Sequence, residues 1–160
     1  LNLNRYSKSI KKILIKNKSK IIFEPGRSII GNSGFLISKI IYIKEGHKKD
    51  FIILDAAMND LMRPALYNAN HRIIPANKNN KKTKKTYEFV GPICESTDKF
   101  STLKGFQKLE EKDLILMCDV GAYGMSLSSN YNLRPKSTEL LINNSKIQVI
   151  AKRQNLKDLI

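Results

Sequence analysis

The spacing of hydrophobic and polar positions changes along the chain, from a helical repeat near the N-terminus to strand-like runs further on. Residues 5–17 predict an amphipathic helix, because lysines lie opposite apolar residues that recur at helical spacing, namely Tyr6, Ile10, Ile13 and Leu14. The almost purely apolar run 20–23 predicts a short strand buried on both faces, as in a parallel sheet. A helix followed by such a strand is typical of one step of a (β/α) barrel or of an open α/β sheet.

From residue 34 onward the patterns are those of β-strands. Residues 34–44 and 50–55 flank a turn-like connector, which predicts a β-hairpin. A second hairpin is predicted for residues 139–142 and 146–150. Other strands are expected at residues 71–75, 87–90 and 114–118, and short helices near residues 60–67, 126–129 and 155–159. The apolar strand predicted at residues 114–118 makes Cys118 a buried core thiol. The predicted fold class is therefore mainly β, with a few short helices.

Length and composition limit the class of protein. The chain has 160 residues and 41% hydrophobic residues, which suits one domain with a real core, or one domain and a piece of another. Its two cysteines and two histidines lack metal-ligand spacing, so we expect neither a metal site nor a disulfide framework. No signal peptide and no apolar run of about 20 residues is seen, which favours a soluble cytoplasmic protein. The first residue is Leu1 and not Met, which suggests a fragment or a processed chain.

The net charge of +15 raises the alternative of a basic β-barrel module that binds nucleic acid. The lysines are spread over the whole chain, however, and only residues 77–85 form a concentrated run. That run contains no aromatic residue on which a base could stack. A solvated loop between two strands is the favoured interpretation, and we expect neither a nucleic-acid partner nor a membrane partner.

The most reactive groups in the sequence lie at residues 91–96, Gly-Pro-Ile-Cys-Glu-Ser. A strand-like run leads into the Gly-Pro break, and Cys94 and Glu95 follow directly. A thiol has a pKa near 8.5, so Cys94 can donate or accept a proton near neutrality after a modest shift. The alternative is a small buried thiol beside a surface carboxylate.

A second stretch, Glu24-Pro25-Gly26-Arg27-Ser28, follows the predicted strand at 20–23. Pro-Gly favours a tight turn in which Gly26 takes a positive φ. Arg27 adds a planar fork that suits a carboxylate or a phosphate. The alternative is a surface turn with a solvated arginine.

Two further stretches carry groups that could bind an anion. Arg63 and Tyr67 are four residues apart, so a short helix capped by Asn59 or Asp60 would place them on one face. Pro64 suits the first turn of that helix. The alternative is an exposed arginine packed on a tyrosine ring. Separately, residues 121–126 place glycines on both sides of Tyr123, which allows backbone or ligand to approach closely.

Taken together, these blocks resemble the C-terminal part of the diaminopimelate decarboxylases, pyridoxal-phosphate enzymes of the alanine-racemase-like fold. The resemblance rests on residues 24–28, 55–67, 91–98 and 121–132, in that order, and covers nearly the whole chain. It implies a (β/α)8 barrel that carries the cofactor, followed by a β-rich domain that is barrel-like or Greek-key-like. Residues 1–30 would then be the last helix and strand of a truncated barrel, and residues 31–160 the β-rich domain.

The resemblance also implies roles for single residues. Those beside the cofactor would be Glu24, Pro25, Gly26, Arg27 and Tyr123. Those that bind the substrate would be Arg27, Arg63, Tyr67, Glu95 and Tyr123. Cys94 would be the proton donor after decarboxylation, and Glu95 would hold the distal ammonium group. In this family the Cys94 and Glu95 positions reach the active site of the partner subunit, which implies a homodimer.

The implied reaction is decarboxylation of meso-2,6-diaminopimelate to L-lysine, with pyridoxal 5'-phosphate as electron sink. Another diamino acid or a carboxylated polyamine is the alternative substrate on the same fold, and Glu95, in place of the Asp of ornithine-type relatives, favours the first choice. A non-catalytic partner that lends Cys94 and Glu95 to a full-length subunit is a further alternative. The sequence departs from the family at Thr97, where glycine is usual. The Schiff-base lysine is expected outside this chain, so we expect a fragment that is inactive alone.

Overall fold

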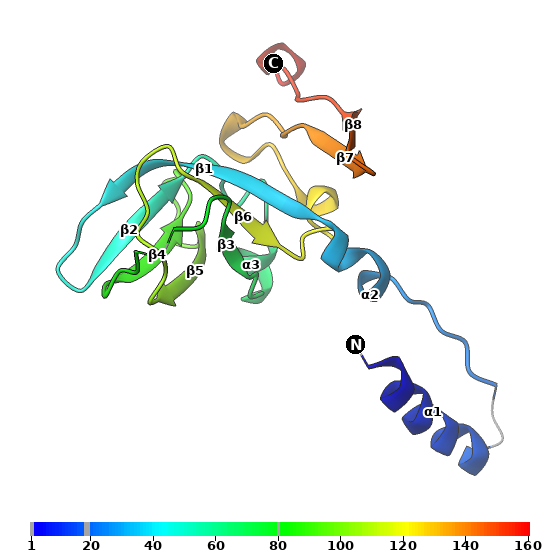
Figure 1. Ribbon diagram of the computed structural model, residues 1–160. Helices are drawn as coiled ribbons and strands as arrows, with labels where there is room; N and C mark the ends of the chain where they lie inside the picture. The colour runs from blue at the N-terminus through cyan, green and yellow to red at the C-terminus, as the bar shows by residue number, and fades with distance from the viewer. Residues whose placement is uncertain (1, 18–19, 80) are drawn as a thin grey trace.

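An amphipathic helix begins the chain in the computed structural model, which describes residues 2–17, 20–79 and 81–160. This helix, α1 (Leu3–Asn17), confirms the predicted one. The Asn2 side chain accepts a hydrogen bond from the backbone N–H of Arg5 at 3.0 Å, as an N-cap residue does. Figure 1 shows α1 set apart from the β-sheet. Its contact with the following segment includes the rings of Tyr6 and Phe23, whose centroids are 6.2 Å apart.

The strand predicted for residues 20–23 is not formed. Residues 20–26 have no regular secondary structure, and Ile22 and Phe23 are 75% and 51% exposed. A strand of this apolar type needs strands at its edges and packing on its faces, and no described residue of this chain supplies them. The short helix α2 (Arg27–Ile30) and a 3-10 turn, η1 (Gly31–Ser33), then lead into the sheet.

A curled six-stranded sheet forms the body of the fold, in the order β3-β6-β1-β2-β4-β5 (Figure 1). The predicted hairpin is present as β1 (Phe35–Lys44) and β2 (Lys49–Leu54). The β2–β4 pair is parallel, and the other neighbours are antiparallel. The remaining strands are β3 (Ile73–Pro75), β4 (Thr86–Val90), β5 (Lys99–Lys104) and β6 (Leu114–Cys118). The mainly β prediction is therefore confirmed.

Strand β5 was not foreseen from the sequence. Its side chains are mostly polar, and only Phe100 is buried. It is held at the sheet edge by pairing with β4 and by the buried carboxylate of Glu88, which forms ion pairs with Lys49 on β2 and Lys99 on β5. The lysine-rich segment 77–85 connects β3 to β4 as predicted, and most of its described residues are exposed.

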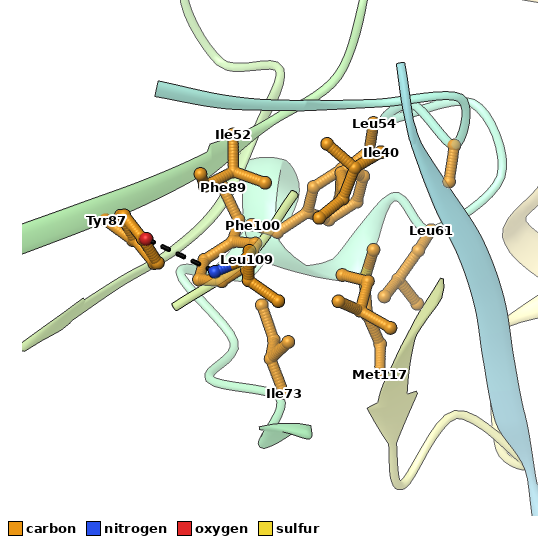
Figure 2. Close-up of a cluster of buried hydrophobic side chains, with 12 residues drawn as sticks. Ile40, Ile52, Leu54, Leu61, Ile73, Tyr87, Phe89, Phe100, Leu109 and Met117 are labelled. Carbon is orange, nitrogen blue, oxygen red and sulfur yellow. Dashed lines mark hydrogen bonds between the residues drawn. The ribbon is translucent and has the colours of Figure 1, made fainter. Parts of the chain in front are cut away.

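The hydrophobic core lies against one face of this sheet (Figure 2). Apolar side chains from all six strands meet there, and Leu61, from the turn before α3, packs with them. Four of the fully buried members are Ile52, Phe89, Ile115 and Met117. Cys118 is 1% exposed, which confirms it as a core thiol.

The second predicted hairpin is also confirmed, as β7 (Glu139–Asn143) and β8 (Lys146–Ala151). Figure 1 shows it separate from the six-stranded sheet. It is preceded by two 3-10 turns, η2 (Met125–Leu127) and η3 (Tyr131–Leu133), and followed by a third, η4 (Leu156–Asp158). The hairpin is therefore a two-stranded element with highly exposed apolar side chains.

Candidate active site

The helix α3 (Arg63–Tyr67) carries the predicted arginine and tyrosine. Pro64 lies in its first turn, as predicted. The predicted cap is wrong, because the N-cap residue is Met62, which makes no side-chain cap. Asp60 instead accepts a hydrogen bond from the backbone N–H of Ala57 at 2.9 Å and so closes the preceding turn. The side chain that could have capped α3 is thus engaged one turn earlier.

Three of the predicted site residues come together at α3. The guanidinium carbon of Arg63 lies 5.7 Å from the ring centroid of Tyr67 and 5.7 Å from that of Tyr123. This confirms that Arg63 and Tyr67 share a face, and it adds Tyr123 from a distant part of the chain. Both rings are more than half exposed. Within the described residues Arg63 has no ion pair, so its N–H groups can donate hydrogen bonds to an anion. We call Arg63, Tyr67 and Tyr123 the arginine–tyrosine cluster.

Backbone geometry places Tyr123 in this cluster. Its φ of 62° is in the left-handed region, which is unusual for a residue with a side chain. At Gly121 a Cβ atom would lie 2.1 Å from the carbonyl oxygen of Ile30, so only glycine permits this approach to α2. The close approach that the flanking glycines predicted is therefore confirmed for Gly121, where the backbone of α2 is the neighbour.

The stretch Glu24-Pro25-Gly26-Arg27 reaches the same region and is exposed. The positive φ predicted for Gly26 is wrong: its φ is −126°, and its carbonyl accepts the N–H of Ile29 at 3.0 Å to begin α2. A Cβ atom on Gly26 would lie 3.9 Å from the hydroxyl of Tyr123. Tyr123 thus connects the stretch that contains Arg27 with α3.

Cys94 and Glu95 lie on a separate element, residues 91–98, which we call the thiol loop. Both side chains are exposed, so the alternative of a buried thiol is excluded. Among the described residues, neither side chain makes a hydrogen bond or an ion pair. Each is therefore free to meet a ligand.

Thr97, which departs from the family pattern, points its hydroxyl at the sulfur of Met58, 3.7 Å away. With Ser96 it lines a groove whose other wall includes α3 residues Pro64 and Ala65. The thiol loop therefore flanks α3. No hydrogen bond, ion pair or cation–π contact among the described residues joins Cys94 or Glu95 to the arginine–tyrosine cluster, so the predicted site residues form two groups.

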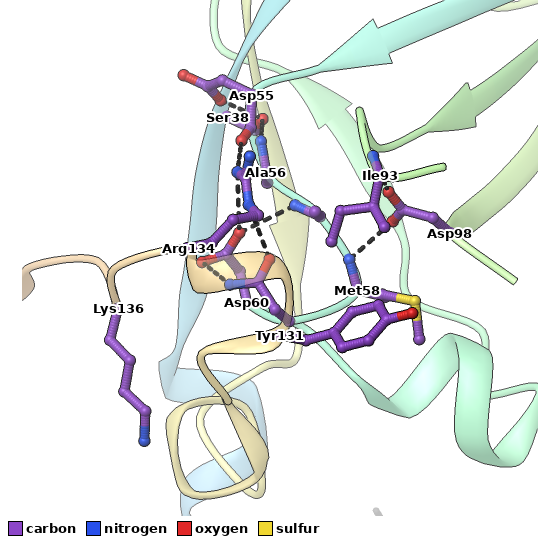
Figure 3. Close-up of polar contacts among 12 residues, drawn as sticks. Ser38, Asp55, Ala56, Met58, Asp60, Ile93, Asp98, Tyr131, Arg134 and Lys136 are labelled. Atoms are coloured by element: carbon purple, nitrogen blue, oxygen red, sulfur yellow. Dashed lines mark hydrogen bonds and ion pairs between the residues drawn. The ribbon is translucent and has the colours of Figure 1, made fainter. Parts of the chain in front are cut away.

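A polar network that the sequence did not reveal supports both groups (Figure 3). Its centre is Arg134, whose guanidinium lies 3.7 Å from the carboxylate of Asp60. The same guanidinium donates hydrogen bonds to the side-chain oxygen of Asn59 and to the carbonyl of Asp55. Burial is the main cause that raises the pKa of Asp60 above its ordinary value, against smaller lowering by the Ala57 N–H and Arg134. The sequence held no clear signal for this network, because its members are widely separated along the chain.

Over residues 2–17, 20–79 and 81–160, no group of three His, Cys, Asp or Glu side chains could hold a metal ion. In the same ranges no helix has the length and apolar character needed to cross a membrane.

Comparison with known proteins shows the family to which the chain belongs. Residues 6–121 match the family described as "Pyridoxal-dependent decarboxylase, C-terminal sheet domain". The chain is 43% identical over 146 residues to the diaminopimelate decarboxylase of Aquifex aeolicus, covering 91% of this chain and 34% of that protein. It is 43% identical over 159 residues to that of Helicobacter pylori, covering 99% of this chain and 39% of that protein.

A solved structure agrees with these sequence matches. The crystal structure of Helicobacter pylori diaminopimelate decarboxylase complexed with L-lysine superposes with a TM-score of 0.84 at 43% identity, over 99% of this chain and 39% of that one. The chain thus spans less than two fifths of the length of these relatives. These matches confirm the resemblance seen in the sequence motifs, and the chain belongs to the pyridoxal-dependent decarboxylase family, whose C-terminal sheet domain it contains.

Proposed function

We propose that this chain is the C-terminal part of a diaminopimelate decarboxylase, which converts meso-2,6-diaminopimelate to L-lysine and CO2 in the last step of lysine biosynthesis. The observation that carries the proposal is the 43% identity over 91% of the chain to a curated enzyme of that name. Solved structures of lysine and lysine/ornithine decarboxylases share only 20–21% identity, which supports a common fold alone. The reaction class therefore follows the closer relatives.

The arginine–tyrosine cluster is suited to one end of such a substrate. Arg63 offers N–H donors in a planar fork that matches a carboxylate. Arg27 adds a second exposed guanidinium, and it directly follows Gly26, which lies beside the Tyr123 hydroxyl. The rings of Tyr67 and Tyr123 flank the Arg63 guanidinium and restrict its orientation. We infer that these residues bind and orient a substrate carboxylate.

The thiol loop is suited to the other part of the reaction. The exposed Sγ of Cys94 can hold a proton and deliver it to the carbon that loses CO2. The adjacent carboxylate of Glu95, also exposed, can bind an ammonium group at the far end of a diamino-dicarboxylate. Two exposed groups on one short loop could thus act on a single ligand.

Pyridoxal 5'-phosphate fits the residues around Tyr123. Its phosphate is a dianion, and the exposed Arg27 and the Tyr123 hydroxyl near Gly26 are donors that suit such a group. When bound, this cofactor withdraws electrons from the bond that breaks. We propose that Glu24, Pro25, Gly26, Arg27 and Tyr123 line its binding site, with the Schiff-base lysine supplied from outside this chain.

We further propose a homodimer with shared active sites. The exposed side chains of Cys94 and Glu95, which make no hydrogen bond or ion pair among the described residues, support this, because they are available to complete the site of a partner subunit. The exposed Ile22 and Phe23 support a second assignment, that residues 1–30 complete a (β/α)8 barrel and residues 31–160 form the β-rich domain.

The test is a hybrid enzyme in which this chain replaces the matching C-terminal segment of the Aquifex aeolicus decarboxylase. CO2 release should occur with meso-2,6-diaminopimelate and exceed that with L-lysine, L-ornithine or a carboxylated polyamine. Cys94→Ala should lower kcat by about a hundredfold or more, the usual contribution of a general acid. A folded, cofactor-loaded hybrid that prefers another substrate would overturn the assignment.

A further inference from the structure

Asp98 ends the thiol loop and is the one acidic side chain of that loop that is buried, with 3% of its surface exposed. Both of its carboxylate oxygens are used (Figure 3). Oδ2 accepts the backbone N–H of Ile93 at 2.8 Å, and Oδ1 accepts the backbone N–H of Met58 at 2.7 Å. One carboxylate thus connects the thiol loop with the turn that leads into α3.

Backbone hydrogen bonds of Asp98 close the loop on itself. Its N–H donates to the carbonyl of Glu95 at 3.0 Å, and its carbonyl accepts the N–H of Gly91 at 3.0 Å. The N–H of Glu95 donates in turn to the carbonyl of Ile93 at 2.8 Å. The backbone on each side of Cys94 and Glu95 is therefore held, while their side chains stay exposed.

The surroundings leave Asp98 in one position. A Cβ atom on Gly91 would lie 2.2 Å from Oδ2 of Asp98, so any larger residue at 91 would displace the carboxylate. An amide at position 98 would offer one acceptor in place of two, so one of the two N–H groups would lose its partner. The geometry requires a carboxylate at 98 and a glycine at 91.

We propose that Asp98 is a positioning residue that fixes the thiol loop, and with it Cys94 and Glu95, relative to the turn at Met58. The hydrogen bonds of Asp98 to Ile93 and Met58 support this positioning. Its consequence for turnover rests on the decarboxylase function proposed in the preceding subsection. Asp98 is buried and acts only through the residues that it holds.

Amide hydrogen exchange of the 160-residue chain, measured by NMR for wild type and Asp98→Asn, tests the structural part. At least one of the N–H groups of Met58 and Ile93 should exchange about tenfold faster or more in the variant, because its hydrogen bond to a charged group is lost. The core amides of Ile52 and Phe89 should keep their rates. Unchanged exchange at Met58 and Ile93 overturns the proposal, and so does equal acceleration of the core amides.

The matched control is Asp113→Asn. That carboxylate also accepts a backbone N–H, from Glu110 at 2.9 Å, but within its own turn. It should accelerate exchange at Glu110 alone. If Asp98→Asn does not fold, amide exchange of wild type in low urea is the alternative measurement. The amides of Met58 and Ile93 should then become exchangeable together, as one unit, at lower urea than the core amides. Separate opening of the two amides overturns the proposal.

Turnover of the hybrid enzyme tests the functional part through a double-mutant comparison. Asp98→Asn should lower kcat at least about tenfold in the otherwise wild-type hybrid. In a Cys94→Ala, Glu95→Gln background the same change should cost less than about twofold, since the residues that it positions are already lost. A full additional loss overturns the positioning role. A hybrid with no activity on diaminopimelate but with the predicted exchange pattern would count against the proposed function alone.

Discussion

Arg134 donates through Nε to Oδ1 of Asn59 at 2.9 Å, although the two residues lie 75 positions apart in the chain. Asn59 is fully buried, and the same guanidinium bonds the carbonyl of Asp55 at 2.5 Å. Arg134 therefore fastens the segment after η3 to the turn that precedes α3. The position of Arg63 depends on this turn, so a residue far from α3 in sequence helps to build the candidate site.

We expect Arg134→Met to destabilise the fold by about 1–3 kcal/mol, because the buried amide oxygen of Asn59 loses its donor while the apolar stem is largely kept. Urea unfolding followed by circular dichroism measures this loss. Lys136→Met is the matched control, since the Lys136 side chain points away from the network in Figure 3. Equal stability of the two variants would show that the Arg134 contacts contribute little.

Asp60 should make stability depend on pH in a direction that its environment sets. Burial raises the pKa of Asp60 in the folded chain, so the folded state binds this proton more tightly than the unfolded state does. The resulting stabilisation is complete below the unfolded pKa, near 4, and is lost as the pH rises through the raised folded pKa.

The measurement compares wild type with Asp60→Asn, whose amide does not titrate. The free energy of unfolding of wild type minus that of the variant should decrease as the pH is raised from about 4 towards neutrality. Urea unfolding at a series of pH values gives this difference. A difference that is constant or increases with pH contradicts the pKa direction.

Local patterns were sufficient to predict most of the elements. The β1–β2 and β7–β8 hairpins have apolar runs flanking turn residues, and α1 has helical periodicity, so their information lies within a few neighbouring residues. Strand β5 was missed because it is an edge strand whose assignment depends on pairing with β4. The run 20–23 was misassigned because apolar character alone does not make a strand when no described neighbour pairs with it.

The candidate site, like the secondary structure, was predictable from the sequence only in part. The spacing of Arg63 and Tyr67 was enough to place both on one helix face, but nothing in the sequence places Tyr123 against the same guanidinium. The roles of Asp98 and Arg134 were missed because each depends on backbone groups brought close only by folding. Long-range polar contacts of this kind have no periodic pattern in the sequence.

The core should respond to truncation in proportion to burial. Phe89 on β4 is fully buried and its ring lies 5.5 Å from that of Phe106, so Phe89→Ala should cost about 3–5 kcal/mol. Phe35 on β1 is 51% exposed and provides the matched control. Phe35→Ala should cost clearly less in thermal or urea unfolding. A similar loss for both would mean that Phe35 is covered in the folded protein in solution.

The β7–β8 hairpin presents one continuous apolar face. Its register pairs Leu140 with Val149 and Ile142 with Ile147, so these four side chains lie on the same side. They are 51–68% exposed. An isolated two-stranded hairpin is marginally stable in water, and an exposed apolar face of this kind promotes association.

Replacing Ile142 and Ile147 with lysine should therefore reduce self-association of the 160-residue chain without affecting the six-stranded sheet, which lies apart from the hairpin in Figure 1. Sedimentation velocity measures the association, and the exchange rates of the Ile52 and Phe89 amides report on the sheet. Gln148→Lys, on the opposite face of the hairpin, is the control and should leave association nearly unchanged. If the double variant associates as wild type does, the self-association surface lies elsewhere, and the exposed apolar residues of α1 are the next to test.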